Sequence, residues 1–408
     1  MITKQYIKDF EKLGFGMFVH FGLYSVLEKG EWAKHVLKVS DEAYSALAQN
    51  FNPHPQWAAQ LAATAKRAGC KYITLTTRHH DGYSLYDTCG LNTWDAPHSC
   101  GRDLVREFVE ACRAEGLIPF FYHTLLDWYE PTFETDFPAY LEYLRKSVEL
   151  LCKNYGKIGG FWFDGTWSKP GADWEEDALY GMIRSYQPEA MLINNTGLSA
   201  LGELGHIELD SVTFERGKPK PLNMEGAPKY VASEMCQVFA NHWGYAANDF
   251  NYKAPADMIR DLTVCRRYGS NLLMNVGPRG DGILSELDAA IFNLMGRWVQ
   301  MNADAIYTPR PSGIQVTNKP EDFILVDGDT YYLFCDRLPI LTDPNVELLR
   351  SAVYEDDFEL NRKIKSVTWL DNGEPLEFEQ NGAEVKVKTV PYRYGNHLVV
   401  RVAKIETE

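Results

Sequence analysis

The 408-residue sequence predicts a (β/α)8-like barrel followed by a small C-terminal antiparallel β-sandwich. Between about residues 10 and 305, short β-rich runs alternate with amphipathic helical stretches, a pattern typical of a parallel sheet with helical connections. Beyond residue 308, alternating apolar and polar runs are separated by Asp-Gly and Asn-Gly turns, which favour antiparallel hairpins. We therefore expect a barrel domain over residues 1–308 and a β-sandwich domain over residues 309–408.

Eight strands are expected in the barrel region, each a short run rich in apolar and β-branched residues. They are Phe15–Val19, Tyr72–Thr76, Ile118–His123, Gly160–Phe163, Met191–Asn194, Ser211–Phe214, Tyr230–Ser233 and Leu272–Val276. Helical stretches show apolar residues at three- and four-residue spacing. They are Trp57–Ala68, Asp103–Glu115, Phe137–Asn154, Asp177–Ser185, Pro255–Tyr268 and Glu286–Asn302. The pattern is least regular over residues 211–233, which hold the sixth and seventh strands.

The C-terminal region predicts five strands that alternate apolar and polar residues. They are Phe323–Val326, Thr330–Phe334, Ile364–Trp369, Glu384–Lys388 and His397–Val402. The segment Thr308–Gly313, with two prolines and a glycine, is predicted to be the linker between the two domains.

Charge and composition exclude several classes of partner. The chain has 56 acidic residues against 41 Lys and Arg, a net charge of −15, which argues against binding nucleic acid or an anionic membrane. No apolar stretch is long enough to span a membrane, and the N-terminus lacks the apolar core of a signal peptide. We expect a cytoplasmic protein, unless a leader has been removed. The eight cysteines are scattered without a C-x-x-C pair, which predicts reduced thiols and no zinc site.

Polar and aromatic side chains gather where the predicted barrel strands end. The buried run over residues 160–163 ends in Asp164, a position where barrel enzymes keep their chemistry and where a structural Asp would cap the next helix. The other strand ends carry, in chain order, His20 with Glu31 and Trp32, His79 with His80, Tyr122, Asn195, Glu215 and Glu234. Hydrogen-bonding groups beside aromatic faces are what a sugar pocket needs.

Each of these residues also has a structural interpretation. His20 could be a structural histidine whose ring is hydrogen-bonded within the protein. Any single Trp could simply pack in the core or at an interface. A metal site at His79 and His80 is not expected, because adjacent histidines on an extended chain point apart and no H-x-H or H-E-x-x-H spacing accompanies them. We therefore predict no metal site at these histidines.

Glycoside hydrolysis requires two carboxylic acids. Asp164 is the candidate nucleophile, and Trp162 lies on the same side of its strand. Glu234, within a largely apolar run, is the candidate proton donor because apolar surroundings raise a carboxyl pKa. Glu215 competes for this role, although the neighbouring Arg216 favours its ionised form. Spacing alone does not choose between the two glutamates.

The motifs resemble those of the α-L-fucosidases of glycoside hydrolase family 29, in order and in approximate spacing. They are residues 15–22, Glu31-Trp32, residues 79–83, residues 162–165, residues 234–236, residues 243–245 and residues 271–278. The resemblance implies a retaining exo-hydrolase that releases terminal α-L-fucose without metal or cofactor. It assigns Asp164 as nucleophile and Glu234 as acid/base, with Glu215 in reserve. The implied sugar-binding residues are His20, Glu31, Trp32, His79, His80, Tyr122, Trp162 and Glu215.

Other functions stay open at this level. The chain could bind fucose without cleaving it, or it could be a related retaining glycosidase for another terminal sugar. A metal-dependent amidohydrolase is the remaining rival. The expected partner is a fucosylated oligosaccharide or glycoconjugate, while self-association is compatible with the sequence but not required by it.

Overall fold

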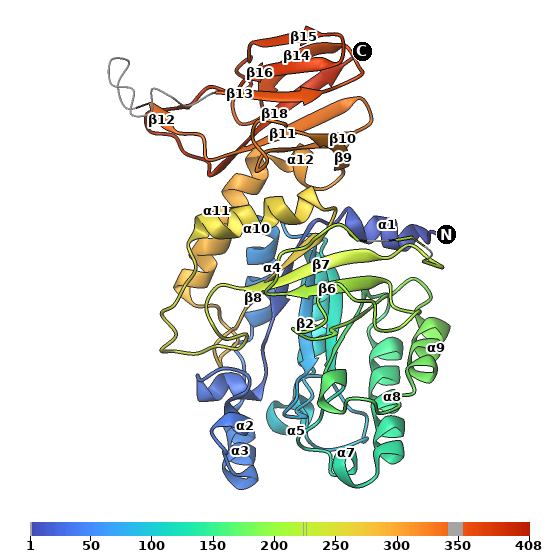
Figure 1. The fold of residues 1–408 in the computed structure, drawn as a ribbon. Coiled ribbons are helices and arrows are strands. Elements are labelled where there is room, and N and C mark those ends of the chain that lie inside the picture. Colours follow the sequence, from blue (N-terminus) through green and yellow to red (C-terminus); the bar gives the residue numbers. More distant parts are fainter. Residues whose placement is uncertain (1, 223, 226, 342–353) are drawn as a thin grey trace. The chain divides into compact units, whose positions relative to one another are not determined.

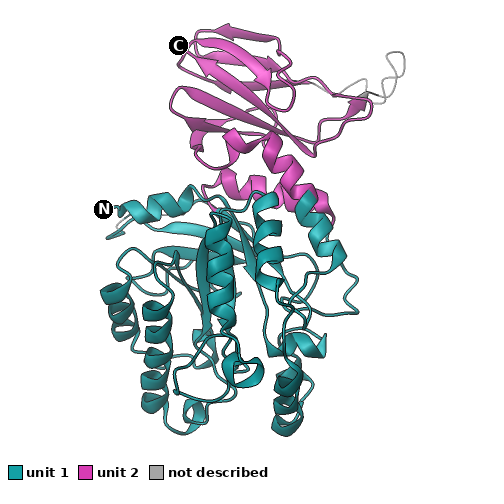
Figure 2. Cartoon of the chain, turned by 180° about the vertical axis from the view of Figure 1, so that it is seen from behind, with its two compact units in different colours: residues 1–253, 271–293 teal, residues 254–270, 294–408 magenta. Residues whose placement is uncertain are grey.

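The computed structural model describes residues 2–222, 224–225, 227–341 and 354–408. The chain divides into two compact units, residues up to 253 together with 271–293, and residues 254–270 together with 294–408 (Figure 2). This division differs from a single cut after residue 308, because helix α10 (Pro255–Arg267) packs against strands of the C-terminal unit. Among the described residues, no helix combines the length and apolar character needed to cross a membrane.

The first unit contains a closed barrel of eight parallel strands, which confirms the predicted fold class (Figure 1). The strands are β1 (Phe15–Val19), β2 (Tyr72–Arg78), β3 (Ile118–Thr124), β4 (Gly160–Asp164), β5 (Met191–Asn194), β6 (Ser211–Glu215), β7 (Ala232–Val238) and β8 (Asn271–Val276). β1 pairs with β8 in register from Phe15 opposite Leu272 to Val19 opposite Val276, and this pairing closes the barrel.

Helices of the first unit precede or connect the barrel strands. They are α1 (Gln5–Glu11), η1 (Leu23–Leu27), α2 (Ala33–Val36), α3 (Asp41–Leu47), η2 (Ala48–Asn50), α4 (Trp57–Arg67), α5 (Ala96–Cys100), α6 (Leu104–Ala114), α7 (Thr132–Thr135), α8 (Phe137–Asn154), η3 (Thr166–Ser168) and α9 (Glu176–Tyr186). Asp103 caps α6 by accepting a 2.9 Å hydrogen bond from the Arg106 N–H, as its sequence position predicts. Between β5 and β6, and in the described part between β6 and β7, the chain forms no helix.

Aromatic residues fill the barrel interior. Phe18, Tyr72, Phe120 and Trp162 belong to one buried cluster, which α1 joins through Phe10. The Phe10 ring centroid lies 5.7 Å from that of Tyr72 and 5.8 Å from that of Phe120. Because Tyr72 opens β2, this helix closes the amino end of the barrel and leaves the carboxyl end for a ligand.

The seventh strand lies further along the chain than predicted. The expectation was Tyr230–Ser233, whereas β7 covers Ala232–Val238. Tyr230 is not available to the ladder because its N–H donates to the carbonyl of Ile2 at 2.8 Å. Glu234 is therefore the third residue of a seven-residue strand and does not lie at its end.

The second unit contains the predicted antiparallel β-structure. Its strands are β9 (Arg310–Gln315), β10 (Phe323–Asp327), β11 (Thr330–Asp336), β12 (Ile340–Leu341), β13 (Glu355–Glu359), β14 (Ile364–Trp369), β15 (Phe378–Asn381), β16 (Glu384–Lys388), β17 (Tyr392–Arg393) and β18 (Val400–Thr407). They form an antiparallel sheet in the order β14-β18-β11-β10-β9, an antiparallel three-stranded sheet β13-β16-β15 and the short parallel pair β12-β17. Helix α12 (Ala303–Ile306) and residues 294–301 of α11 (Glu286–Met301) belong to the same unit.

Two expectations for this unit were wrong. The predicted linker over residues 308–313 largely forms β9, which tolerates Pro311 because it is the edge strand of its sheet. The last predicted strand, residues 397–402, is displaced to β18, where residues 400–407 lie between β11 and β14. Pairing on both sides extends this strand beyond its apolar start.

Candidate active site

A cavity of about 470 Å³ lies at the carboxyl ends of the barrel strands. Eight of the ten site residues named from the sequence contribute to its wall. It is lined by Phe18, His20, Trp32, His79, His80, Tyr122, Trp162, Asp164, Trp167, Asn195, Gly197, Leu198, Ser199, Glu215 and Trp243. The two predicted residues that do not line it are Glu31 and Glu234.

Asp164 is the last residue of β4 and is held by four neighbours. Its Oδ2 accepts a 3.1 Å hydrogen bond from the Tyr122 hydroxyl and lies 3.5 Å from Nε2 of His80. Its Oδ1 accepts a 3.0 Å hydrogen bond from Trp167 Nε1 and a 3.3 Å bond from Asn195 Nδ2. Burial raises the carboxyl pKa, but the hydrogen bonds and the charge of His80 outweigh it, so the pKa of Asp164 is lowered.

The turn after Asp164 depends on Gly165. Its φ of 115° is strained for a residue with a side chain. A Cβ atom there would also lie 2.6 Å from the backbone nitrogen of Leu126. The glycine therefore lets the chain leave β4 sharply and bring Trp167 back over the carboxylate.

Glu215 ends β6 and faces the same cavity. Burial, followed by the negative charge of Asp164, raises the pKa of its carboxyl group. Oε2 accepts a 2.7 Å hydrogen bond from Nδ2 of Asn195, the same nitrogen that bonds Asp164. The environment therefore separates the two carboxyl groups into one that favours ionisation and one that favours the proton.

The shared amide also limits how far apart the two carboxyl groups lie. Asp164 Oδ1 and Glu215 Oε2 lie 3.3 and 2.7 Å from Asn195 Nδ2. The distance between these two oxygens therefore cannot exceed the sum of the two contacts. This is less than the separation of about 6.5–9.5 Å that inverting glycosidases need for a water molecule. The geometry favours a retaining reaction.

The histidines of the cavity have distinct partners. His20 Nδ1 lies 2.6 Å from Asn275 Oδ1, and burial lowers its pKa to about 3, which keeps the ring neutral. Burial also lowers the pKa of His79, whose Nδ1 is a buried polar atom without a partner among the described residues. These neutral rings can exchange hydrogen bonds with hydroxyl groups without introducing charge.

His80 connects Asp164 with Thr124. The Thr124 hydroxyl donates to the carbonyl of Leu126, so it can only accept from His80 Nδ1, which lies 2.7 Å away. Nδ1 therefore carries a hydrogen, and Nε2 donates to Asp164 when it carries one as well.

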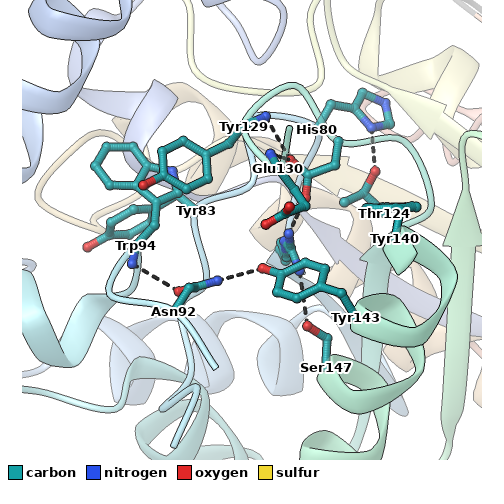
Figure 3. A network of polar contacts seen from close by, with 12 residues as sticks. His80, Tyr83, Asn92, Trp94, Thr124, Tyr129, Glu130, Tyr140, Tyr143 and Ser147 are labelled. Atoms are coloured by element: carbon teal, nitrogen blue, oxygen red, sulfur yellow. Dashed lines mark hydrogen bonds and ion pairs between the residues drawn. The ribbon is translucent and has the colours of Figure 1, made fainter. Parts of the chain in front are cut away.

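A buried ion pair supports the loop over residues 127–130, of which Figure 3 labels Tyr129 and Glu130. Arg78 and Asp127 are 1% and 3% exposed and pair directly, and Arg78 Nη1 donates to Ser147 Oγ at 3.1 Å. Asp127 Oδ1 accepts the N–H groups of Tyr129 and Glu130 at 2.7 and 2.9 Å. Trp128 lies in the turn between Asp127 and Tyr129, and its N–H donates a 2.8 Å hydrogen bond to the carbonyl of His80.

Aromatic rings form much of the cavity wall. Trp32 stacks against Trp167 with ring centroids 5.9 Å apart, and Phe18 contacts Trp162 and Trp243 at 5.0 and 5.9 Å. Such rings cover the apolar C–H faces of a sugar, while the carboxylates, amide and imidazoles address its hydroxyl groups.

Glu234 lies below the cavity, inside the barrel. It is 1% exposed and accepts hydrogen bonds from Trp162 Nε1 at 3.0 Å and from the Tyr72 hydroxyl. In the strand register it pairs with Thr213, two residues before Glu215. Burial raises its pKa to about 7, yet the side chain lies outside the cavity wall.

Glu31 does not line the cavity but supports a loop that does. It is 6% exposed, and its Oε2 accepts the backbone N–H groups of Trp243 and Gly244 at 3.0 and 2.8 Å. It therefore fixes the loop that presents the Trp243 ring to the cavity.

Several lining residues are absent from the site that the sequence predicts. Trp167 lies three positions after Asp164, and that spacing was an available signal. Asn195 and Trp243 were visible as strand-end and motif residues, but nothing in the sequence indicated that Asn195 joins two carboxylates. Residues 197–199 carry no chemical signal of their own.

One group of described residues could hold a metal ion, and it lies in the C-terminal unit. Ligand atoms of Asp322, Cys335 and Asp356 are within 4.8 Å of one another. Asp356 is already bonded by Lys319 Nζ at 3.0 Å and by the Thr389 hydroxyl. None of these residues lines the 470 Å³ cavity.

Comparisons with known proteins agree on one family. The family model for alpha-L-fucosidase matches residues 2–304. The tissue alpha-L-fucosidase of Mus musculus is 26% identical over 339 residues, covering 75% of this chain and 72% of that protein. The structure of alpha-L-fucosidase isoenzyme 1 from Paenibacillus thiaminolyticus is 28% identical, with a TM-score of 0.84 and 99% of both chains covered. A family 29 fucosidase from Bacteroides thetaiotaomicron, solved as a trapped covalent intermediate with a 2-fluoro-fucosyl fluoride, is 22% identical, covers 99% of this chain and 96% of that chain, and has a TM-score of 0.82.

Proposed function

Because this chain belongs to the α-L-fucosidase family of glycoside hydrolases, we propose that it releases terminal α-L-fucose from fucosylated oligosaccharides or glycoconjugates with retention of configuration. The observation that carries the proposal is the Asn195 amide, which joins Asp164 and Glu215 within one sugar-sized cavity. The two carboxyl groups have pKa values shifted in opposite directions, as a nucleophile and a proton donor require.

In the first step, a carboxylate oxygen of Asp164 attacks the anomeric carbon. The bond to the leaving oxygen breaks as Glu215 transfers its proton to that oxygen. In the second step, Glu215 removes a proton from a water molecule, whose oxygen attacks the anomeric carbon. The bond to Asp164 breaks, fucose is released, and both carboxyl groups return to their starting state. The trapped intermediate of the Bacteroides thetaiotaomicron relative supports a covalent path of this kind.

Glu215 takes the acid/base role in this proposal in place of Glu234. A proton donor must come within hydrogen-bond reach of the leaving oxygen. Glu215 lines the cavity, whereas both oxygens of Glu234 already accept hydrogen bonds from Tyr72 and Trp162 inside the barrel. We assign Glu234 to positioning the Trp162 ring.

The remaining wall binds the sugar. His20, His79 and His80 lie close enough to one another to meet neighbouring hydroxyl groups, with ring centroids 5.5 Å apart for His20–His79 and 4.2 Å for His79–His80. The rings of Trp32 and Trp162 would cover its apolar faces.

The test is hydrolysis of 4-nitrophenyl α-L-fucopyranoside with EDTA present, comparing the wild type with Asp164→Ala. We expect turnover that survives the chelator and falls by several orders of magnitude in the variant, because the nucleophile is missing. A matched Asp173→Ala variant, which alters an exposed aspartate of the following loop, should keep wild-type turnover. Full activity in Asp164→Ala would overturn the assignment.

A further inference from the structure

The chain changes direction directly after Glu215. Arg216 has a φ of 54°, an uncommon value for a residue with a side chain. Its guanidinium carbon lies 5.1 Å from the centroid of the Trp243 ring and its Nη2 donates a 2.7 Å hydrogen bond to the carbonyl of Asn241. The residue next to the proton donor is thereby joined to the loop over residues 239–253.

A second cavity, of about 360 Å³, opens at this junction. Its wall includes Arg216, Ala240, Asn241, Asn251 and Tyr252. The group that leaves a glycosidic bond departs on the side of the proton donor, since that donor must reach the bridging oxygen. Arg216 lines the second cavity and packs on the ring of Trp243, which lines the first cavity together with Glu215. The second cavity therefore adjoins the place where the leaving group emerges.

The loop around this cavity is held in one conformation by Asp249. Its carboxylate accepts the N–H groups of Asn241 and His242 at 2.8 and 3.2 Å, and that of Asn251 at 3.3 Å. It also accepts from Asn241 Nδ2 at 2.8 Å and lies 2.7 Å from His242 Nδ1. A loop that is ordered before binding loses little entropy when a ligand arrives.

The wall offers the chemistry of a saccharide site. The side chain of Asn251 donates to Asn241 Oδ1 at 3.1 Å, and among the described residues its own Oδ1 keeps its accepting capacity. In the part of the chain that the structure describes, Arg216 donates a hydrogen bond only through Nη2, which leaves the N–H groups of Nε and Nη1 as donors. Tyr252, which also lines the cavity, supplies an aromatic ring to its wall.

We propose that this second cavity is the subsite for a neutral saccharide to which the fucose is attached. The proposal rests on the function proposed above and identifies the substrate as a fucosylated oligosaccharide in which the sugar next to the fucose is also recognised. Arg216, Asn251 and Tyr252 contact that sugar, and Asp249 positions the loop.

A larger cavity of about 580 Å³ is the rival location. It is lined by His35, Trp128 and Glu134 among others, and it meets the first cavity where the Trp32 and Trp128 rings lie 5.1 Å apart. Its residues follow β1 and β3, whereas Glu215 is the last residue of β6. We therefore place the leaving group in the 360 Å³ cavity.

The experiment compares kcat/KM for a fucosylated oligosaccharide with kcat/KM for 4-nitrophenyl α-L-fucopyranoside. The oligosaccharide is the best substrate of a panel with α-1,2, α-1,3, α-1,4 and α-1,6 linkages. Ala240→Trp fills the proposed subsite and Asn251→Ala removes one polar contact. Thr135→Trp fills the rival cavity, and Asn248→Ala alters an exposed amide of the same loop that lines neither cavity.

We expect the ratio of oligosaccharide to aryl activity to fall at least about tenfold in Ala240→Trp and about threefold to tenfold in Asn251→Ala, the effect of losing one hydrogen bond. It should stay within about twofold of the wild type in both controls. An unchanged ratio in Ala240→Trp, or a fall confined to Thr135→Trp, would overturn the subsite. Wild-type turnover of the aryl fucoside with no cleavage of any oligosaccharide would also overturn it, whereas turnover of neither substrate would overturn the proposed function itself.

Discussion

The indole Nε1 of Trp162 donates a 3.0 Å hydrogen bond to Oε1 of Glu234, inside the barrel and beneath the cavity. The other oxygen of Glu234 accepts from Tyr72, so the carboxyl group is occupied by two aromatic donors. Its buried position explains its raised pKa without any part in proton transfer. The two glutamates that the sequence offered for one role thus have different structural positions.

Substituting the two glutamates should have different effects, one on catalysis and the other on stability. Glu215→Gln should lower kcat on oligosaccharides by about 10²–10⁴-fold, because general acid catalysis is lost. Aryl fucosides with good leaving groups should lose less, and added azide should raise their turnover by replacing water in the second step. Measured steady-state kinetics with both substrate types check this.

Glu234→Gln should mainly reduce stability. One of its two aromatic donors would face the amide nitrogen of the glutamine and lose its acceptor, at a cost of about 1–3 kcal/mol in the free energy of unfolding. Urea denaturation measures that cost. A loss of oligosaccharide activity with azide rescue in Glu234→Gln, and not in Glu215→Gln, would return the acid/base role to Glu234.

The pH profile of kcat/KM should be bell-shaped and should lose one limb in Glu215→Gln. Activity requires ionised Asp164, whose pKa is lowered from 3.8, and protonated Glu215, whose pKa is raised from 4.5. Activity therefore rises as pH passes the first apparent pKa and falls as pH passes the second, with both values belonging to the coupled pair. Glu215→Gln cannot ionise, so its residual activity on an activated aryl fucoside should not decline on the alkaline side. A retained decline would assign that limb to another group.

Breaking the buried pair of Arg78 and Asp127 should be costly. Arg78→Met or Asp127→Asn alone should lower the free energy of unfolding by about 3–5 kcal/mol, because each leaves an uncompensated buried partner. The double variant Arg78→Met/Asp127→Asn should cost less than the two single changes combined. Urea denaturation of all four proteins tests this, and additive costs would contradict a direct pairing.

Asp322 should make the protein less stable as pH rises. Burial, with Asp356 nearby, raises its pKa well above the usual 3.8, so over a range of pH the folded state holds a proton that the unfolded state has released. This contribution to stability is complete below pH 3.8 and is lost as pH rises through the raised pKa of the folded state. Asp322→Asn should therefore be the more stable protein at pH 8, with a smaller difference between pH 5 and pH 8.

Thermal unfolding at these two pH values checks the Asp322 prediction. Equal pH dependence in the wild type and Asp322→Asn would contradict it. A melting temperature raised by added Zn²⁺ would instead identify Asp322, Cys335 and Asp356 as metal ligands.

The barrel was predictable because buried parallel strands appear as short apolar runs, and Asp164 ends one of them. Glu234 was misplaced because polar residues inside a strand look like its end. Its buried partner Trp162 is distant in sequence, so the compensating hydrogen bond could not be foreseen. The same holds for Asn195, whose bridging role depends on the spacing between β4 and β6. Strand β9 was taken for a linker because edge strands accept proline.

The most direct test of the account uses a 2-fluoro-fucosyl fluoride to trap the intermediate on Glu215→Gln, followed by peptide mass spectrometry. The fluorine slows the second step, so the covalent adduct should accumulate. The account predicts one fluorofucosyl group on the peptide that contains Asp164, and none when Asp164→Ala is added. A label on Glu234 or another carboxylate, or turnover of the reagent without any adduct, would contradict it.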